Sequence, residues 1–292
     1  MTAASLVEFD QLALERTVRT LSKVGIRKTP LTLDGVKAWV KQFQTDAERT
    51  LAWLMLRSLV FRTSEQLESV MRQALKQAVN HYLSERGSGG NANWREAAAA
   101  TDGDLSFYCG PPTLDGQPQP GKSGEIVTRL VNRSFGVPKW YPNSITQLLE
   151  GERYLVVDDG LFTGLQLEGF LQQWGQRYDT GRIGIVVGIA HEVGIEYLAR
   201  QFPDVRVFCG ERLTADNCFL QQCAEWVTNG QWPHAKTPGQ TYLDICHRHG
   251  FTNGQLGFGS LGVMVAYEHG IPDDALRLLW GRAPDWKPLV ER

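Results

Sequence analysis

The second half of the chain alternates short apolar strands with helices, and this alternation constrains the fold more than any other feature. Apolar residues at Tyr154–Val157 precede a glycine-containing loop and an expected helix over Leu165–Trp174. Further strands are expected over Ile183–Ile189, Val205–Phe208 and Leu261–Tyr267. Buried strands separated by helices are typical of a parallel sheet covered on both faces. The pattern therefore predicts an α/β fold, a parallel sheet flanked by helices.

Charge and composition exclude several classes of protein. Against 30 Lys and Arg stand 32 Asp and Glu, a net charge of −2, so no general nucleic-acid binder is expected. The longest apolar run, Ile183–Ala190, is far shorter than the roughly 18 residues of a membrane-spanning helix. The first twenty residues include Glu8, Asp10 and Glu15 and lack a signal-peptide core. We therefore expect a cytoplasmic protein without membrane contact.

The cysteines favour a reduced interior over a disulfide framework. There are five of them, an odd number, scattered through a chain of ordinary size. Cys246, His247 and His249 form a candidate metal corner, but no second pair follows at a zinc-finger spacing. Reduced structural cysteines are the preferred interpretation.

Residues 1–86 differ from the rest in charge and pattern. They carry a net charge of +4, whereas the remainder carries −6. Apolar residues recur at three- and four-residue steps, and Thr45 with Glu48 and Thr63 with Gln66 have the spacing of a capping box. Glycines then dominate 87–90, as in a flexible linker. We predict a helical N-terminal region over 1–86 and an α/β domain over 91–292, with the basic excess on a solvated helix face.

The most informative motif follows the strand Tyr154–Val157. Asp158 and Asp159 end the strand, and a loop containing Thr163 and Gly164 then opens a helix. Ligands of open parallel sheets bind outside the carboxyl ends of the strands, and a helix N-terminus suits a phosphate. Two carboxylates can accept hydrogen bonds from vicinal hydroxyls or hold Mg²⁺. The motif predicts a sugar-phosphate site.

Acid pairs also occur in three other settings, which differ in the sequence that surrounds the pair. The pair could be a helix cap beside a solvated charge, and this structural interpretation stays open. A receiver domain would have acids after an early strand and a later phosphate-binding lysine, and neither is found in that order. A haloacid-dehalogenase-type nucleophile would have Asp-x-Asp-x-Thr, which this segment lacks.

The segment from Tyr154 to Gln166 resembles the PRPP-binding signature of type I phosphoribosyltransferases: an apolar strand, two acids and a Thr/Gly loop. The C-terminal stretch narrows the resemblance to the phosphoribosyltransferase-like domain of bacterial conflict and defence systems, the PRTase-CE type. Its ordered features are His269, Pro272, Trp280, Trp286, Pro288, Leu289 and Arg292. Trp39, Phe43 and the segment 121–124 also fall where that branch has them, so the resemblance covers roughly residues 34–292.

The resemblance implies a role for each matching residue. It gives Asp158 and Asp159 the catalytic position, holding the ribose hydroxyls and, indirectly, Mg²⁺. The residues implied to bind the 5′-phosphate are Phe162, Thr163, Gly164, Leu165 and Gln166. The candidate anion contacts are Lys122 and Ser123, and the candidates for base recognition are His191 and Glu192. His269 is a weaker candidate, beside a turn that the branch uses for packing.

The resemblance also implies a function. The chain would be an effector of a bacterial anti-phage system, retron- or toxin-like, acting with Mg²⁺ at a ribosyl C1 of a nucleotide, PRPP or a nucleic acid. A second defence component, such as a reverse transcriptase with its non-coding RNA, would be its partner. Leu165 and Gln166 depart from the usual small and hydroxyl residues, and Gly160 replaces an aliphatic one. These departures leave a second interpretation, a non-catalytic module that senses a nucleotide or PRPP and regulates a partner.

Overall fold

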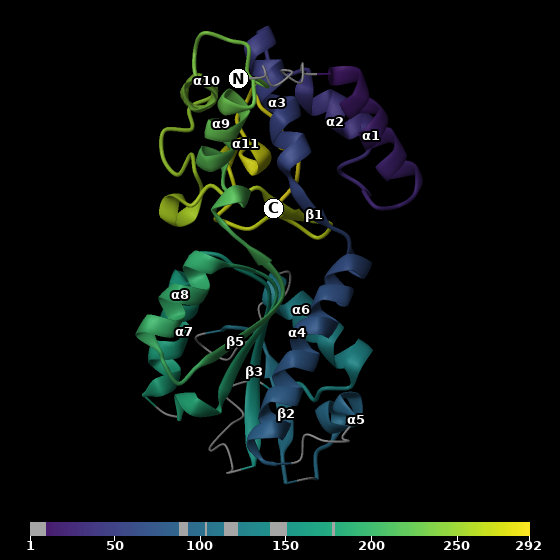
Figure 1. The fold of residues 1–292 in the computed structure, drawn as a ribbon, viewed down its shortest axis with the longest axis vertical. Coiled ribbons are helices and arrows are strands. Elements are labelled where there is room, and N and C mark those ends of the chain that lie inside the picture. The colour runs from purple at the N-terminus through teal and green to yellow at the C-terminus, as the bar shows by residue number, and fades with distance from the viewer. Residues whose placement is uncertain (1–9, 88–92, 103, 114–121, 141–150, 177–178) are drawn as a thin grey trace, which may run out of the picture. The chain divides into compact units, whose positions relative to one another are not determined.

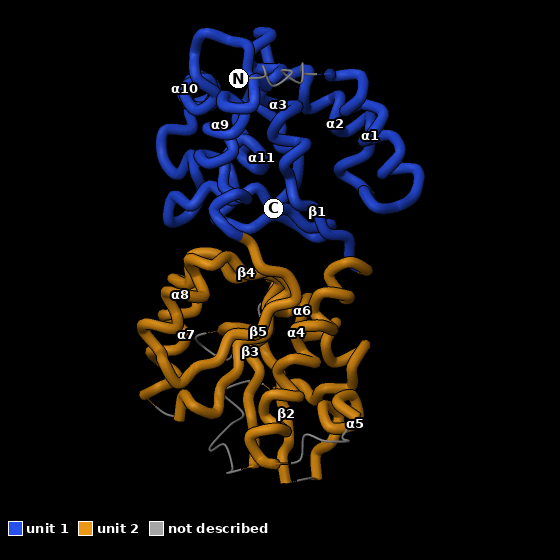
Figure 2. Tube along the Cα trace, in the orientation of Figure 1, with its two compact units in different colours: residues 1–64, 214–292 blue, residues 65–213 orange. Residues whose placement is uncertain are grey.

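The structure, a computed structural model, describes residues 10–87, 93–102, 104–113, 122–140, 151–176 and 179–292 (Figure 1). It contains two compact units (Figure 2). Unit 1 combines Met1–Ser64 with Thr214–Arg292, and unit 2 is Glu65–Leu213. Within the described residues, no helix combines the length and apolarity needed to cross a membrane.

Unit 2 is built on a four-stranded parallel sheet. Its strands are β2 (Ser106–Gly110), β3 (Glu152–Leu161), β4 (Ile183–His191) and β5 (Arg206–Leu213), which lie in chain order. The α/β fold is thus confirmed, and three expected strands are present in longer form. β2 was not expected, because its five residues carry no pattern that sets them apart from a loop.

Helices cover both faces of this sheet. Figure 1 shows α7 (Leu165–Gly175) and α8 (Glu192–Gln201) on one side, and α4 (Ser64–Glu85) and α6 (Ser123–Phe135) on the other. The short α5 (Trp94–Ala99) and a 3₁₀ turn, η2 (Thr180–Arg182), complete the unit. The core under α7 and α8 consists of the apolar residues of β3 and β4 with Phe170, Leu171, Trp174 and Leu198.

Two glycines, Gly188 of β4 and Gly210 of β5, allow α4 to pack closely on the sheet because they have no side chain. A Cβ at Gly210 would lie 2.0 Å from the carbonyl oxygen of Val70, and one at Gly188 would lie 2.7 Å from Leu67. Further along α4, the ring of Tyr82 contacts those of Phe107 and Phe208. This packing explains why α4 belongs to unit 2, although residues 1–86 were expected to form one region. The compact units do not divide at the predicted boundary between residues 86 and 91.

Unit 1 joins the two ends of the chain. Its elements are α1 (Gln11–Lys23), α2 (Leu33–Val40), α3 (Asp46–Ser58), β1 (Val60–Arg62), η3 (Ala215–Asn217), α9 (Phe219–Thr228), α10 (Pro238–Arg248), η4 (Phe258–Ser260), β6 (Val265–Tyr267) and α11 (Arg277–Trp280). β1 and β6 pair in parallel, with Val60 beside Val265. The expected strand Leu261–Tyr267 is therefore corrected: only its last three residues form β6, and they join β1 instead of the main sheet.

Aromatic packing fixes the C-terminal segment within unit 1. Trp286 is 1% exposed, and its ring centroid lies 5.1 Å from that of Phe43 and 6.2 Å from that of Trp39. Its indole N–H donates to the carbonyl oxygen of Leu278 at 3.1 Å. Trp280 is half-buried and stacks under Arg277, whose guanidinium carbon lies 4.0 Å from the ring centroid. The C-terminal residues thus pack on the helices near the N-terminus.

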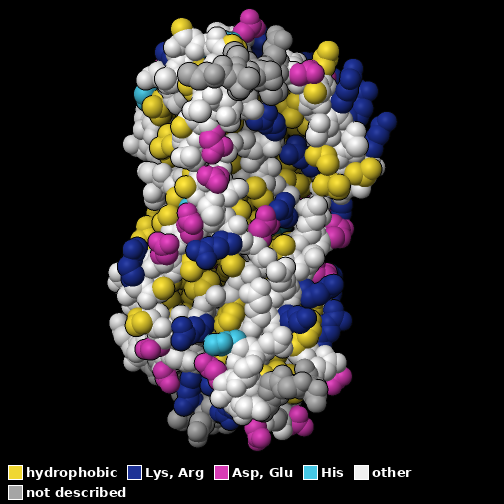
Figure 3. Space-filling model, in the orientation of Figure 1, with side chains coloured by type: hydrophobic (Ala, Val, Ile, Leu, Met, Phe, Trp, Pro, Cys, Tyr) yellow, Lys and Arg dark blue, Asp and Glu magenta, His cyan; other side chains and the backbone are white. Residues whose placement is uncertain are grey.

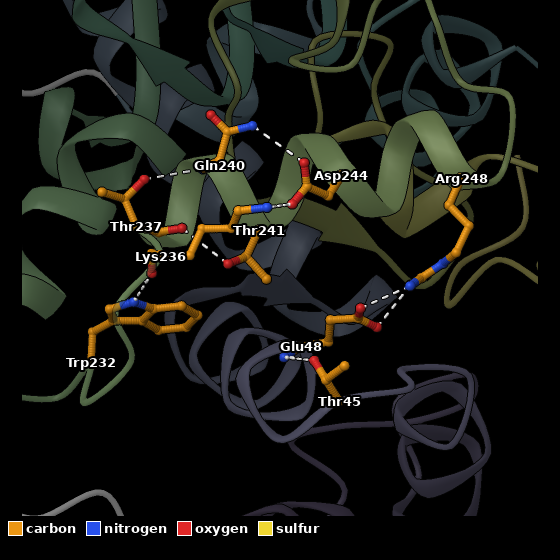
Figure 4. A network of polar contacts seen from close by, with 9 residues as sticks. All are labelled: Thr45, Glu48, Trp232, Lys236, Thr237, Gln240, Thr241, Asp244 and Arg248. Atoms are coloured by element: carbon orange, nitrogen blue, oxygen red, sulfur yellow. Dashed lines mark hydrogen bonds and ion pairs between the residues drawn. The ribbon is translucent and has the colours of Figure 1, made fainter.

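An ion pair between the buried Glu48 and the exposed Arg248 also joins distant parts of unit 1 (Figure 4). Thr45 caps α3 by accepting from the backbone N–H of Glu48 at 3.2 Å. The Glu48 carboxylate accepts two hydrogen bonds of 2.8 Å from Arg248 on α10 and one of 2.8 Å from the N–H of Gln44. Burial alone raises the pKa of Glu48, but the bonds from Arg248 and Gln44 outweigh burial and leave that pKa below its ordinary value.

Candidate functional site

The acid pair lies near the carboxyl end of the central strand β3. The strand continues to Leu161, so Asp158 and Asp159 belong to its last four residues instead of following it. Their exposed fractions are only 6% and 8%. Asp158 Oδ1 accepts from Ser123 Oγ at 2.7 Å and from the backbone N–H of Asp159 at 2.9 Å. Two adjacent carboxylates are therefore enclosed at the edge of the sheet where open α/β folds bind ligands.

The environment of Asp158 disfavours its ionised form. Burial raises the pKa of Asp158 well above its ordinary value, and the neighbouring charge of Asp159 raises this pKa further. The hydrogen bonds from Ser123 and from the Asp159 N–H act in the opposite direction without cancelling the rise. A buried carboxylate next to another acid lowers the stability of the fold, and such arrangements are typical of binding and catalytic sites.

A glycine brings the chain from β3 into α7. Gly164 precedes the helix with φ +84°, and a Cβ there would lie 2.9 Å from the ring of Tyr197 and 3.3 Å from the carbonyl oxygen of Gly194. Both the left-handed conformation and the close approach require glycine. No side chain of the described residues caps the start of α7. Its first N–H groups therefore remain available to an anion.

The loop is shorter than the sequence predicted. Only Phe162, Thr163 and Gly164 lie between β3 and α7, and Phe162 is buried whereas Thr163 is half-buried. Leu165 and Gln166 are the first two residues of α7 and are exposed. These two residues can therefore offer backbone N–H groups from the first helical turn.

A contact between α7 and α8 supports this helix start. The hydroxyl of Tyr197 donates to Glu168 Oε2 at 2.6 Å, and Gln172 donates to the other carboxylate oxygen at 3.0 Å. Sequence reasoning missed this pair. The acid in the first turn of α7 is visible in the sequence, but its partner lies 29 positions away and no local pattern connects the two.

The residues expected to contact a second anion lie at the start of α6. Lys122 is the exposed N-cap of that helix and makes no side-chain capping bond. Ser123 directs its hydroxyl to Asp158, so its bond in this structure is to an acid of the pair. Gly124 lies against the end of β2, because a Cβ there would lie 2.9 Å from Pro111 Cβ. Of the Gly/Pro-rich stretch 110–124, residues 114–121 lie outside the described residues.

The candidates for base recognition lie at the end of the next strand. His191 ends β4 with 1% of its surface exposed and caps α8, where its Nδ1 accepts from the N–H of Val193 at 3.2 Å. Glu192 is the first residue of α8 and is half-buried. Leu161 of β3 pairs with Ala190 of β4, so the two strands end side by side. The acids, the loop and His191 thus share one edge of the sheet.

The residues present suit a loosely held hard cation. Mg²⁺ in proteins takes oxygen ligands, often one or two carboxylates with ligand phosphates and waters completing the shell. Asp158 and Asp159 supply carboxylate oxygens, and a cation beside them would offset the repulsion that raises the pKa of Asp158. Among the described residues, no cluster of three or more His, Cys, Asp or Glu side chains could hold a metal alone. The site fits Mg²⁺ bound together with a ligand.

The cysteines lie apart from this chemistry. All five are free thiols, and Cys246, in the candidate metal corner, is buried in unit 1. Burial raises the pKa of Cys109, Cys223 and Cys246 to about 12. These three thiols therefore remain protonated at neutral pH.

A parallel sheet with an enclosed acid pair at its carboxyl edge, followed by a glycine-started helix, defines a phosphoribosyltransferase-like domain. The chain belongs to the PRTase-CE family, whose model matches residues 36–292. The expected resemblance is thereby confirmed. No curated protein matches the chain.

Solved structures show weak likeness. The orotate phosphoribosyltransferase from Aeropyrum pernix is 20% identical over 47% of this chain and 70% of its own, with a TM-score of 0.27. The AQ2163 protein from Aquifex aeolicus is 16% identical over 64% and 86% of the two chains, with a TM-score of 0.26. The UMP synthase of Leishmania donovani is 12% identical over 73% of this chain and 42% of its own, with a TM-score of 0.28.

Proposed function

We propose that unit 2 binds a 5-phosphorylated ribosyl ligand, PRPP or a nucleotide, together with Mg²⁺. The observation that carries the proposal is the enclosed pair Asp158 and Asp159, held next to an uncapped helix start in a member of the PRTase-CE family. Enclosing two adjacent acids costs stability, so a fold retains them where a ligand or cation repays that cost. The same edge of the sheet provides donors for a phosphate.

Each group has a distinct task in this proposal. The two carboxylates accept hydrogen bonds from the vicinal ribose hydroxyls and hold the sugar; they do not attack it. Ser123 and the Asp159 N–H both donate to Asp158 Oδ1, which orients this carboxylate toward the ligand. The N–H groups of Leu165 and Gln166, at the positive end of α7, bind the 5′-phosphate. Asp158 and Asp159 would hold Mg²⁺ together with the ligand, and the ion would supply positive charge to stabilise the leaving group.

In the cell, we propose an effector of a bacterial anti-phage system, held in check by a second component of the system. The C-terminal features that placed the chain in its family, among them Trp280 and Trp286, support this role, because the resemblance ties that branch to conflict systems. The target would be a nucleotide or a nucleic acid, and the protein would act in the cytoplasm.

A regulatory module without catalysis is the second candidate. It is favoured by Leu165, whose apolar side chain is 39% exposed at the first turn of α7, where the signature has a small residue. Such a module would bind the same ligand and transmit its presence to a partner.

Calorimetric titration of PRPP into the full chain, with and without Mg²⁺, tests the binding site. Wild type should bind with micromolar affinity only with Mg²⁺, and the double variant Asp158→Asn/Asp159→Asn should lose binding while keeping its circular dichroism spectrum. Asp102→Asn is the matched control, because Asp102 is exposed and precedes β2 at the other end of the sheet. Equal binding by wild type and the double variant would refute the site.

Expression in bacteria separates the two candidates. An effector enzyme should slow growth, and Asp158→Asn should abolish that effect at equal protein level. A sensing module should bind PRPP in the calorimeter without slowing growth and without releasing pyrophosphate from it.

A further inference from the structure

The start of α7 offers a phosphate backbone donors but little positive charge. No described side chain caps its first N–H groups. α7 contains no lysine or arginine, and neither do the first two turns of α8, residues 192–198. These stretches carry three glutamates instead, Glu168, Glu192 and Glu196. The surroundings therefore suit a phosphate of low charge.

Two exposed cations at the same edge of the sheet belong to other elements. Lys122 precedes α6, and Arg212 lies near the end of β5, which β4 separates from β3. A phosphate monoester carries about 1.5–2 negative charges at pH 7, whereas a diester carries one. A helix start supplies only about half a positive charge. The start of α7 therefore balances a diester better than a monoester.

Exposed apolar side chains lie at the start of both helices. Leu165, the first residue of α7, is 39% exposed, and Val193, the second residue of α8, is 43% exposed. The two starts pack together, because a Cβ at Gly194 would lie 2.4 Å from the carbonyl oxygen of Phe162, and one at Gly164 would lie 3.3 Å from that of Gly194. Side chains of a helix lean toward its N-terminus, so Leu165 and Val193 extend toward the end where a phosphate would bind.

α8 differs from α7 in its first turn. His191 Nδ1 accepts from the N–H of Val193 at 3.2 Å and so caps this helix. Figure 3 shows hydrophobic surface over the part of unit 2 where Figure 1 draws α7 and α8. A ligand that extends past its 5′-phosphate toward α8 would therefore contact apolar side chains, which suit the face of a nucleobase or a ribose.

We propose that the ligand of this site is a ribonucleoside with free 2′ and 3′ hydroxyls whose 5′-phosphate is a diester leading to a second nucleoside, as at the 3′ end of an RNA strand or in a dinucleotide. The inference rests on the proposed function, in which the acid pair holds the hydroxyls and the start of α7 holds the phosphate. The diester places one negative charge at α7, and the second nucleoside contacts Leu165 and Val193. An internal nucleotide of a strand does not fit, because its 3′ oxygen is esterified.

Calorimetric titration of three adenosine probes into the full chain with Mg²⁺ tests the charge and the apolar contact separately. The probes are adenosine 5′-monophosphate (AMP), its methyl ester, which is a diester without a second nucleoside, and the dinucleotide ApA, which is a diester with one. Affinity should rise in that order, with ApA at least about tenfold tighter than AMP. ApA that ends in 3′-deoxyadenosine lacks one hydroxyl for the acid pair and should bind about tenfold more weakly than ApA.

Variants of the two apolar residues test the second contact. Leu165→Ser and Val193→Ser should each reduce the preference for ApA over the AMP methyl ester about threefold. Leu220→Ser is the matched control, because Leu220 is an exposed leucine at the start of α9 in unit 1, and it should leave this preference unchanged. Circular dichroism confirms that each variant is folded. A longer oligoadenylate that binds more tightly than ApA would identify RNA as the source of the diester, whereas tighter binding of diadenosine 5′,5′-diphosphate would identify a dinucleotide.

The outcomes separate this inference from the proposed function. If PRPP binds through Asp158 and Asp159 but ApA binds no more tightly than AMP, the diester is wrong and the site stands. If neither PRPP nor any adenosine probe binds, both proposals fail. A preference for ApA that both serine variants leave unchanged overturns the contact with Leu165 and Val193.

Discussion

The two units of this protein are assembled in opposite ways. Unit 2 is one continuous stretch, and its sheet follows chain order from β2 to β5. Unit 1 combines the two ends of the chain, and its strand pair joins Val60 to Val265, about two hundred positions apart. Local contacts close short loops and cost little chain entropy, whereas unit 1 depends on long-range contacts to hold its parts together. Single side chains at those contacts should therefore matter most in unit 1.

One buried carboxylate in each unit sharpens the contrast. Glu48 accepts three hydrogen bonds, two of them from the cation Arg248, and its pKa lies below its ordinary value. Asp158 lies beside a second acid, and its pKa lies well above its ordinary value. The first carboxylate stabilises its unit, and the second lowers the stability of its unit. This difference supports the proposal that the binding site lies in unit 2.

The largest effect should come from Trp286→Ala. Removing this buried ring leaves a cavity against Trp39 and Phe43, and we expect a loss of about 3–5 kcal/mol in the free energy of unfolding. Denaturant unfolding measures the loss, and hydrogen exchange should show faster exchange in α3 and α10 with β3 and β4 still protected. Trp286→Phe, which keeps a ring, should lose much less. If amide exchange became equally fast in both units, the ring of Trp286 would not stabilise unit 1 in particular.

Glu48→Gln should destabilise unit 1 by about 1–2 kcal/mol at pH 7, because it removes the charge that strengthens the two hydrogen bonds from the solvent-exposed Arg248. The folded-state pKa of Glu48 lies below the ordinary 4.5, so its contribution is complete above that value and disappears as the pH falls through the folded-state pKa. Urea unfolding measures the free energy of unfolding of wild type and variant. The difference between them should be large at pH 7 and should disappear in acid. If the difference in the free energy of unfolding were the same in acid, the charge of Glu48 would not stabilise unit 1.

Gly164→Ala should cost about 1–2 kcal/mol, because it places a side chain in a left-handed conformation and against Tyr197. It should also weaken PRPP binding, since the start of α7 must move. Gly169→Ala in the same helix is the control. A Cβ at Gly169 meets no atom within 4 Å, so alanine there should stabilise α7 by about 0.5–1 kcal/mol. Thermal unfolding measures the stability of both variants, and calorimetry measures their affinity for PRPP. Equal changes in the two variants would show that the conformation and close contacts of Gly164 do not require glycine.

The smallest effect has the opposite sign. Asp158→Asn keeps an oxygen for Ser123 and removes the enclosed charge, so it should stabilise unit 2 by an amount on the order of 1 kcal/mol at pH 7. A raised folded-state pKa means that wild type gains stability as the pH falls from that pKa toward the ordinary 3.8, so the advantage of the variant should shrink in acid. Melting temperatures across this range measure the effect. Destabilisation at pH 7 would show that the carboxylate is satisfied within the fold.

Much of unit 2 could be predicted because its signals are local. The apolar runs at Tyr154–Val157 and Ile183–Ile189 are the interiors of β3 and β4. The pattern Asp158, Asp159 and Gly164 lies within seven residues, and its order alone indicated an acid pair before a helix start. The start of α7 at Leu165 was predicted correctly, whereas the continuation of β3 to Leu161 was not, because the length of a strand depends on its pairing with β4 as well as on local propensity.

The alternation of strands and helices, the acid pair and the capping of α3 by Thr45 could all be predicted from local sequence, since each depends on neighbours within one element. Three other contacts became visible only in the folded structure: α4 lies on the glycines of β4 and β5, β6 pairs with β1, and Ser123 donates to Asp158. These contacts join residues far apart in the chain. They depend on which surfaces meet after the elements form, and the residues show no local pattern that reveals their partners.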